Sequence, residues 1–343
     1  MKVDIGSLKK KIIFAVIVLA FAAVGIACLI IRCLYITREN LLLAYEKQIL
    51  PGIVCWGDSL TFGSGGNGTS YPSVLEERLR NERMYIPVVN MGIGGENTVT
   101  IAGRAGAIPF RLKEFTIPEE SIPVEIFYQE DEGKSIRPFE QGDSGINPCI
   151  INGVSGRMSG ERSEDGIMHY FFTRSEKGET VHVPEGTEVE TWAASQYSDY
   201  VYVVFMGENH GWNNIQDLIE QQQAILSMQE KYAGNYIVVG LPTGTREERR
   251  ELEEALYEAF GDKFLNIREY LSTQGIYDAG IKPSEDDLAR MEEGLIPTSL
   301  LADHIHFNAA GYRLIGNFMY ERMNELGYFD ELSDVVAEYG TFF

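Results

Sequence analysis

The stretch Ile53-Val54-Cys55-Trp56-Gly57-Asp58-Ser59-Leu60-Thr61-Phe62-Gly63-Ser64-Gly65-Gly66 decides the fold of this chain. It opens with a short apolar run, which is typical of a buried strand. The run ends in Gly57-Asp58-Ser59 and a glycine-rich loop, and residues 71–84 then have the apolar spacing of an amphipathic helix. A strand, a sharp turn and a helix lift a serine hydroxyl to the carboxyl edge of a sheet, where backbone N–H groups at the helix start can face negative charge. Ser59 is therefore a candidate nucleophile, and the alternative is a plain helix cap.

Beyond this stretch, apolar runs alternate with helical patterns. The predicted strands cover 87–93, 200–206, 235–241 and 264–267, and the predicted helices include about 98–107, 215–232, 246–260 and 309–326. Buried apolar strands alternating with helices favour a parallel sheet that is covered on both faces. We therefore expect a three-layer α/β/α fold with a five-stranded parallel, flavodoxin-like sheet. Ligands in such folds lie outside the carboxyl ends of the strands.

One stretch, residues 108–194, interrupts the alternation. It contains short β-prone runs separated by Gly and Pro, at 116–118, 124–127, 169–173 and 181–184. We predict an inserted β-rich domain here, which divides the main domain into 37–107 and 195–330 and leaves 331–343 as a C-terminal tail. The insert either binds substrate or rims the cleft, or it only decorates the fold or supports oligomers.

The N-terminal segment predicts a membrane anchor. Ile12 to Ile31 carries no charged residue, and about 20 apolar residues span a hydrocarbon core of ~30 Å as a helix. Lysines precede this run, and Arg32 and Arg38 follow it, which favours a cytoplasmic N-terminus and an exported body. We expect residues 1–36 to form a cytoplasmic tip and a single transmembrane helix, with the catalytic domain outside the cytoplasm. The alternative is a cleaved signal, because Gly25-Ile26-Ala27-Cys28 faintly resembles a lipoprotein cleavage site.

The charge and the cysteines exclude several classes of protein. The formal net charge is −22, and residues 1–39 are net basic, so the remaining body is more acidic still and should repel nucleic acid. Only Cys55 and Cys149 lie beyond the anchor, and Cys55 falls in the predicted core strand, which argues against a disulfide framework. The chain has no Gly-x-Gly-x-x-Gly after a strand, no phosphate-binding loop and no metal-ligand pattern. We therefore expect no cofactor, no metal and no nucleotide.

A second chemical stretch precedes the last predicted helix, at residues 300–308. A serine needs a base to become a nucleophile, and a histidine base needs an acid that fixes its tautomer. An Asp three residues before a His can curl back to reach its Nδ1 atom, and His306 has this spacing from Asp303. His304 is only one residue from Asp303 and should point elsewhere. For a histidine considered alone, a solvated loop position is the simpler reading.

Taken together, these blocks resemble the SGNH (GDSL) hydrolase family. The resemblance rests on Gly57-Asp58-Ser59-Leu60, a glycine after the second strand, Gly-x-Asn after the third and Asp-x-x-His near the C-terminus. It covers about residues 50–107 and 200–325 and leaves the insert outside. It implies that Ser59 is the nucleophile, His306 the base and Asp303 the third triad member. It also implies three oxyanion donors: the backbone N–H groups of Ser59 and Gly95 and the side-chain amide of Asn209.

The resemblance implies a serine esterase, with one departure from the usual pattern. His210 stands where many relatives have Asp, which puts the substrate preference in doubt more than the catalysis. We expect Asp58, His210 and Trp212 to contact the substrate. The expected function is a membrane-anchored extracytoplasmic esterase that removes O-acyl groups, O-acetyl groups above all, from a carbohydrate. The alternatives are an O-acyltransferase acting on a cell-surface glycan, or a catalytically silent glycan-binding surface protein.

Overall fold

The structure, a computed structural model, describes residues 20–36, 46, 49–130, 133–143 and 145–334. Its centre is a five-stranded sheet in the order β13-β12-β11-β1-β2, with every neighbouring pair parallel. In chain order this is 2-1-3-4-5, the flavodoxin-like order. The predicted fold class is therefore confirmed. The strands are β1 (Ile53–Gly57), β2 (Val88–Gly92), β11 (Val201–Phe205), β12 (Tyr236–Val239) and β13 (Phe264–Leu265).

The alternation of side chains along each strand builds two hydrophobic layers. In β1, Ile53 and Cys55 face one layer while Val54 and Trp56 face the other, and all four are fully buried. Successive side chains of a strand point to opposite faces, so a wholly apolar strand requires cover on both. This is why the apolar runs of the sequence became the centre of the molecule.

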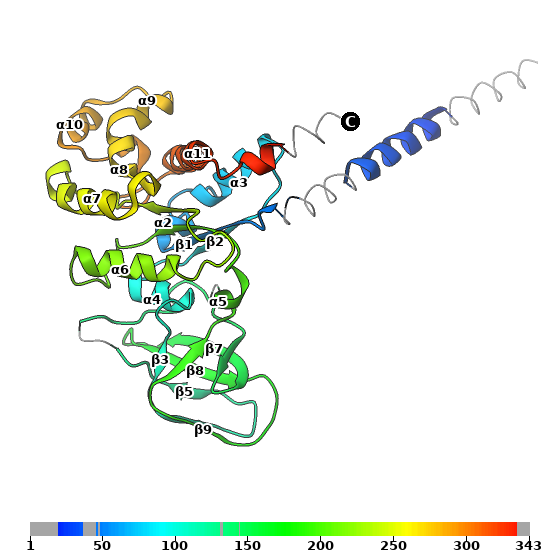
Figure 1. Cartoon of the computed structure of the whole chain (residues 1–343), viewed down its shortest axis with the longest axis vertical. Helices are drawn as coiled ribbons and strands as arrows, with labels where there is room; N and C mark the ends of the chain where they lie inside the picture. The colour runs from blue at the N-terminus through cyan, green and yellow to red at the C-terminus, as the bar shows by residue number, and fades with distance from the viewer. Residues whose placement is uncertain (1–19, 37–45, 47–48, 131–132, 144, 335–343) are drawn as a thin grey trace, which may run out of the picture.

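Helices cover both faces of the sheet. Those that carry the core or the site are α2 (Ser59–Phe62), α3 (Tyr71–Asn81), α4 (Thr98–Arg104), α5 (Trp192–Gln196), α6 (Ile215–Leu226), α7 (Arg246–Phe260) and α11 (Ala309–Glu325). α3 and α11 pack on one face, and α4, α5 and α6 on the other (Figure 1). Three further α-helices, which the sequence analysis did not predict, lie between β13 and α11: α8 (Ile267–Tyr270), α9 (Ile276–Asp278) and α10 (Glu285–Glu293).

One predicted helix is shorter than expected. The apolar spacing predicts a helix over 215–232, but α6 ends at Leu226. Beyond it, the buried side chain of Gln229 donates to the carbonyls of Tyr200 and Asn235. These two hydrogen bonds pair the carbonyls of two loops and fix a turn after Leu226. Tertiary contacts therefore end the helix, although the apolar spacing of the sequence continues beyond it.

The stretch predicted as an insert forms antiparallel sheet. Six strands pair in the order β3-β10-β6-β7-β8-β5, and β4 pairs with β9. Their bounds are β3 (Arg111–Leu112), β4 (Phe115–Ile117), β5 (Val124–Ile126), β6 (Cys149–Ile151), β7 (Val154–Arg162), β8 (Met168–Arg174), β9 (Val181–Val183) and β10 (Thr187–Glu190). These strands enclose their own apolar cluster, with Phe172 and Ile126 fully buried, and lie beyond α4 and α5 (Figure 1). The domain boundaries stay a prediction.

At the N-terminus, residues 20–36 form a helix whose side chains are all exposed. The predicted anchor Ile12–Ile31 begins in residues 1–19, and most of the predicted tail falls on 335–343, so both lie partly outside the described residues. Within the residues that the structure describes, no helix is both long enough and apolar enough to cross a membrane.

Candidate active site

Ser59 begins the one-turn helix α2 directly after β1. The turn is sharp because Gly57 has no side chain: a Cβ there would lie 2.1 Å from the Thr61 hydroxyl and 2.4 Å from the carbonyl oxygen of Phe205. Asp58 caps the helix by accepting the N–H of Leu60 at 2.9 Å. The sequence therefore holds Ser59 at the carboxyl edge of the sheet, as predicted from the strand, turn and helix pattern.

His306 and Asp303 meet Ser59 from the far end of the chain. The Nε2 atom of His306 lies 2.9 Å from the Ser59 hydroxyl, and its Nδ1 atom lies 2.8 Å from Asp303 Oδ2. The second carboxylate oxygen of Asp303 accepts the backbone N–H groups of Ile305 and His306 at 2.8 and 2.7 Å. The structure thus brings the three predicted triad residues into one hydrogen-bonded chain.

The loop that carries His306 rests on the glycine-rich loop after α2. Gly65, at φ +83°, has its missing Cβ position 2.7 Å from Ala302 and 3.2 Å from the Cβ of His306. The Tyr312 hydroxyl donates to the carbonyl of Ser64 at 2.8 Å, which ties α11 to the same loop. A side chain at position 65 would push the histidine away from Ser59, so this glycine is required by the close approach of two loops.

The environment of Asp303 favours its charged form. Partial burial raises the pKa of its carboxyl, but hydrogen bonds from the backbone and ring of His306 and from the Ile305 N–H outweigh this effect. The balance holds the pKa of Asp303 well below its usual range. An ionised Asp303 accepts the Nδ1–H of His306, which leaves Nε2 as the acceptor that faces the serine.

Two of the predicted oxyanion donors are backbone N–H groups, those of Ser59 and Gly95. Ser59 is the first residue of a helix, where N–H groups have no partner within the helix. Gly95 has φ +78°, and among the described residues none accepts its N–H in a hydrogen bond. Both predicted backbone donors are therefore available, while their catalytic role stays a prediction.

Asn209, the third predicted donor, is engaged inside the protein. Its Nδ2 atom lies 3.2 Å from Asp58 Oδ2 and 3.1 Å from the carbonyl oxygen of Glu96. A carboxamide nitrogen carries two hydrogens, so both have partners in this structure. Both contacts are longer than the usual ~2.9 Å. Donation to an oxyanion therefore requires Asn209 to exchange one long hydrogen bond for the substrate oxygen.

Asp58 does not lie where a substrate contact was expected. It is 1 % exposed, and its two carboxylate oxygens accept from Leu60 and Asn209. Burial raises the pKa of Asp58 to about 7, which the Leu60 N–H opposes and the charges of Glu208 and Glu96 reinforce. The expectation that Asp58 contacts substrate is therefore wrong, because this side chain is used to hold the nucleophile turn and Asn209 together.

The other two residues predicted to contact the substrate, His210 and Trp212, differ in their exposure. His210 has φ +62° and is exposed, and its backbone carbonyl accepts the N–H of Thr98 at the start of α4. Trp212 is half-buried, donates its indole N–H to the carbonyl of Gly207 and packs against the apolar cluster between α6 and α7. His304 is exposed and has no described hydrogen bond to Asp303 or Ser59, in line with its expected direction.

A buried ion pair behind the site was missed by the sequence analysis. Arg104 Nε donates to Glu96 Oε2 at 2.6 Å, and both side chains are fully buried. The same guanidinium donates to the carbonyls of Met91 and Gly57. Arg104 thus joins the ends of β1 and β2 to the residue after Gly95. No local pattern marks such a pair, because its partners come together only when the sheet forms.

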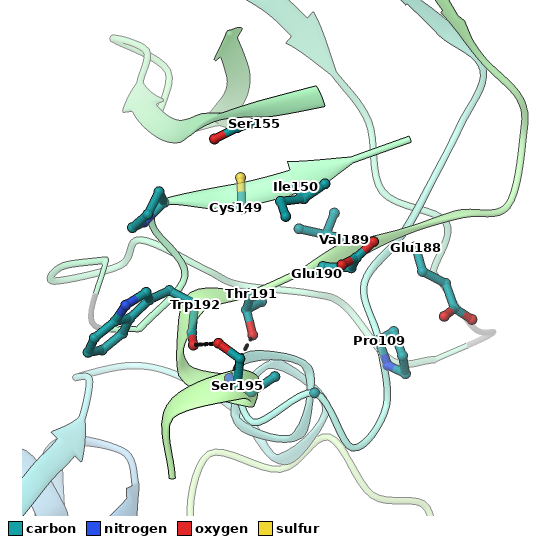
Figure 2. A pocket seen from close by; sticks show the side chains of 13 residues that line it. Pro109, Cys149, Ile150, Ser155, Glu188, Val189, Glu190, Thr191, Trp192 and Ser195 are labelled. Atoms are coloured by element: carbon teal, nitrogen blue, oxygen red, sulfur yellow. Dashed lines mark hydrogen bonds between the residues drawn. The ribbon is translucent and has the colours of Figure 1, made fainter. Parts of the chain in front are cut away.

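A separate cavity of about 490 Å³ lies at the junction with the antiparallel sheet (Figure 2). Cys149 and Ile150 of β6 line one side, and Thr191 and Ser195 line another. Ser59, Asp303 and His306 do not line it.

In the part of the chain that the structure describes, no cluster of His, Cys, Asp or Glu could hold a metal ion.

A comparison with family profiles identifies the family of this chain. The profile of the family described as GDSL-like Lipase/Acylhydrolase matches residues 53–319. Among solved structures, the chain is similar to AlinE4, an SGNH-hydrolase family esterase, at 13 % identity over 73 % of this chain and 93 % of that one, with a TM-score of 0.33. It is also similar to a peptidoglycan O-acetylesterase at 13 % identity, over 83 % and 95 % of the two chains, with a TM-score of 0.32. A comparison with curated proteins found no match.

Proposed function

Because the chain belongs to the GDSL-like lipase/acylhydrolase family and is a serine ester hydrolase, we propose that it removes O-acyl groups, mainly O-acetyl groups, from a carbohydrate outside the cytoplasm. One observation carries the chemistry: the hydrogen-bonded chain from Ser59 through His306 to Asp303 at the carboxyl edge of the sheet. Nucleophile, base and orienting acid within hydrogen-bond reach are the signature of covalent acyl transfer.

In the proposed acylation step, Ser59 attacks the ester carbonyl. His306 Nε2 takes the hydroxyl proton as the Ser59 oxygen bonds to the carbonyl carbon, and Asp303 stabilises the resulting imidazolium. The carbonyl oxygen becomes an oxyanion, which accepts the N–H groups of Ser59 and Gly95. When the tetrahedral intermediate collapses, His306 returns the proton to the leaving alcohol, which departs and leaves an acyl-Ser59 ester.

Deacylation repeats the same steps with water. His306 takes a proton from water, the hydroxide oxygen bonds to the acyl carbon, and the Ser59 oxygen leaves with the proton that His306 returns. The products are the free acid and the regenerated serine. An acyltransferase would use a second alcohol in place of this water, so the fate of the acyl group distinguishes the two reactions.

Polar side chains exposed on the segments that carry the site support a carbohydrate substrate. Asp303 and His210 are exposed on these segments, and they offer partners for hydroxyl groups. The net charge of −22 disfavours a polyanionic substrate at low salt. A neutral or cationic acylated sugar fits both properties.

Acetate release tests the proposal. We expect the full chain to react with a serine-directed fluorophosphonate, and to release free acetate from a mono-O-acetylated hexose and from an O-acetylated polysaccharide. Labelling together with turnover of p-nitrophenyl acetate, but no acetate from any sugar ester, would show that the substrate class is wrong. Recovery of the acetyl group on a second sugar, instead of as free acetate, would identify an acyltransferase.

We further propose that the N-terminal segment holds the catalytic domain at the outer face of a membrane. The support comes from the uncharged run Ile12–Ile31 and from the exposed large apolar side chains of residues 20–36, among them Phe21, Leu29 and Ile31. We expect the full chain to stay with the membrane through high-salt and carbonate washes and to be released by detergent. Recovery of a soluble form that begins after residue 28 would instead indicate a cleaved signal.

A further inference from the structure

A segment of the antiparallel insert lies across the loop that carries Gly95. We call residues 133–143 the strap, and residues 93–97 the oxyanion loop. Asn97 donates its side-chain amide to the carbonyl of Ser135, and the backbone N–H of Arg137 donates to the Thr100 hydroxyl at 2.7 Å. Asn97 is also the N-cap of α4. The strap is therefore bonded to the last residue of the oxyanion loop and to the first turn of α4.

An ion pair fixes the strap to a second element of the main domain. Lys134 Nζ lies 2.8 Å from Asp217 Oδ2, with side chains 15 % and 19 % exposed. Asp217 is in the first turn of α6 and also accepts the N–H of Asn213, just after the segment that holds Asn209 and His210. The strap thus contacts the oxyanion loop and α6, and Asn209 joins the oxyanion loop to Asp58, the residue before Ser59.

The end of the strap touches the oxyanion loop directly. A Cβ built on Gly94 would lie 2.2 to 2.5 Å from the three terminal atoms of the Gln141 amide, and one built on Gly95 would lie 3.3 Å from the Cβ of Glu140. The amide of Gln141 therefore lies against the backbone of Gly94. A side chain at position 94 would displace this amide from the oxyanion loop.

The backbone before Gln141 adopts a conformation that costs energy. Phe139 has φ +66°, in the left-handed region that non-glycine residues rarely adopt. Its ring faces Tyr170, with centroids 6.4 Å apart. Glu140 Oε2 forms an ion pair with Arg162 Nη2 at 2.6 Å. The insert thus supports the geometry that brings Gln141 to the oxyanion loop, and strain of this kind gathers at functional sites.

We infer that Gln141 is a specificity-determining residue of the esterase, and that its amide binds hydroxyl groups of the sugar whose ester is cleaved at Ser59. This inference rests on the proposed function. Gln141 is exposed, and among the described residues none hydrogen-bonds its side chain. An amide offers two donors and an acceptor, which match hydroxyl groups and not an alkyl chain. Glu140, its neighbour, is already paired with Arg162.

Two variants of Gln141 test the inference against a matched control. Gln141→Leu keeps the bulk that covers Gly94 and removes the amide, and Gln141→Ala removes both. Gln129→Ala removes another amide of the insert, one that donates to Glu185 instead of lying on the oxyanion loop. Steady-state kinetics on 6-O-acetylglucose and on p-nitrophenyl acetate give kcat and KM for each protein.

We expect both Gln141 variants to lose about fivefold in kcat/KM on 6-O-acetylglucose, mainly through KM, because one neutral hydrogen bond contributes about 1 kcal/mol. Turnover of p-nitrophenyl acetate should stay within about twofold of wild type, and Gln129→Ala should match wild type on both esters. Equal losses on both esters would show that Gln141 only supports the oxyanion loop. Unchanged kinetics on both would remove its role, and both outcomes overturn the inference.

The proposed function fails in a different way. It fails if wild-type protein cleaves p-nitrophenyl acetate but no sugar ester. The inference about Gln141 fails if wild type cleaves 6-O-acetylglucose and the two Gln141 variants do so equally well.

Discussion

Replacing Ser59 with alanine is expected to lower kcat for acetyl-ester hydrolysis by about 10⁶-fold, and replacing His306 with alanine should cost about as much. The Ser59 hydroxyl is 2.9 Å from His306 Nε2. Covalent catalysis needs both residues, because the histidine accepts the proton that the serine loses when it attacks. The double variant Ser59→Ala/His306→Ala should be little worse than either single variant, because triad residues act as a unit. Steady-state turnover of p-nitrophenyl acetate, with circular dichroism as the check on folding, measures all three proteins.

His304 provides the matched control for this prediction. It is two residues from His306 in the same loop, it is exposed, and no described hydrogen bond joins it to Asp303 or Ser59. His304→Ala should therefore keep most of the activity. Comparable losses at both histidines would refute the assignment of His306 as the base, and so would a double variant whose losses multiply.

Replacing Asp303 with asparagine is expected to lower kcat by about 10⁴-fold while leaving KM nearly unchanged. The carboxylate accepts the Nδ1–H of His306 at 2.8 Å, whereas an asparagine amide can present its own N–H there. The ring would then carry its proton on Nε2 and could no longer accept the proton of Ser59. The expected defect is thus the wrong tautomer in a site of unchanged shape.

The loss of activity from a wrong tautomer of His306 can be separated from a loss caused by a shift of the loop 303–306. One oxygen of Asp303 accepts the backbone N–H groups of Ile305 and His306, and the asparagine oxygen can keep those bonds. Asp165→Asn, in an exposed turn of the insert, is a matched control that should match wild type. If Asp303→Asn keeps more than about a tenth of wild-type activity, then Asp303 does not set the tautomer.

Local patterns were sufficient to predict the core of the fold. The strands that contain Val54, Val203 and Val238 are short, apolar on both faces and followed by helical spacing, and a covered parallel sheet buries such runs on both faces. The positions of Ser59 and of the Asp303–His306 loop could also be predicted, because turn residues and a spacing of three are local features. GDSL-family membership followed from the same blocks.

Other features depend on contacts between residues that are far apart in the chain. The sequence placed Asp58 in the substrate site, but folding buries it and turns its carboxylate toward Asn209, 151 residues away. The Glu96–Arg104 pair and the contact of Gln141 with Gly94 likewise arise from packing between elements.

The sequence by itself therefore determined the sheet, the nucleophile turn and the histidine loop, because hydrophobic periodicity and short-range hydrogen bonding are encoded over a few residues. Only the tertiary structure decided which polar groups remain available to a substrate. A polar side chain can hydrogen-bond to a partner from any element that packs against it. A buried polar group that is left unpaired destabilises the fold, whereas an exposed one can bond to water or to a ligand. Asn209 and Gln141 show the two outcomes: the first is held by Asp58 and Glu96, and the second lies exposed on the loop that carries Gly95.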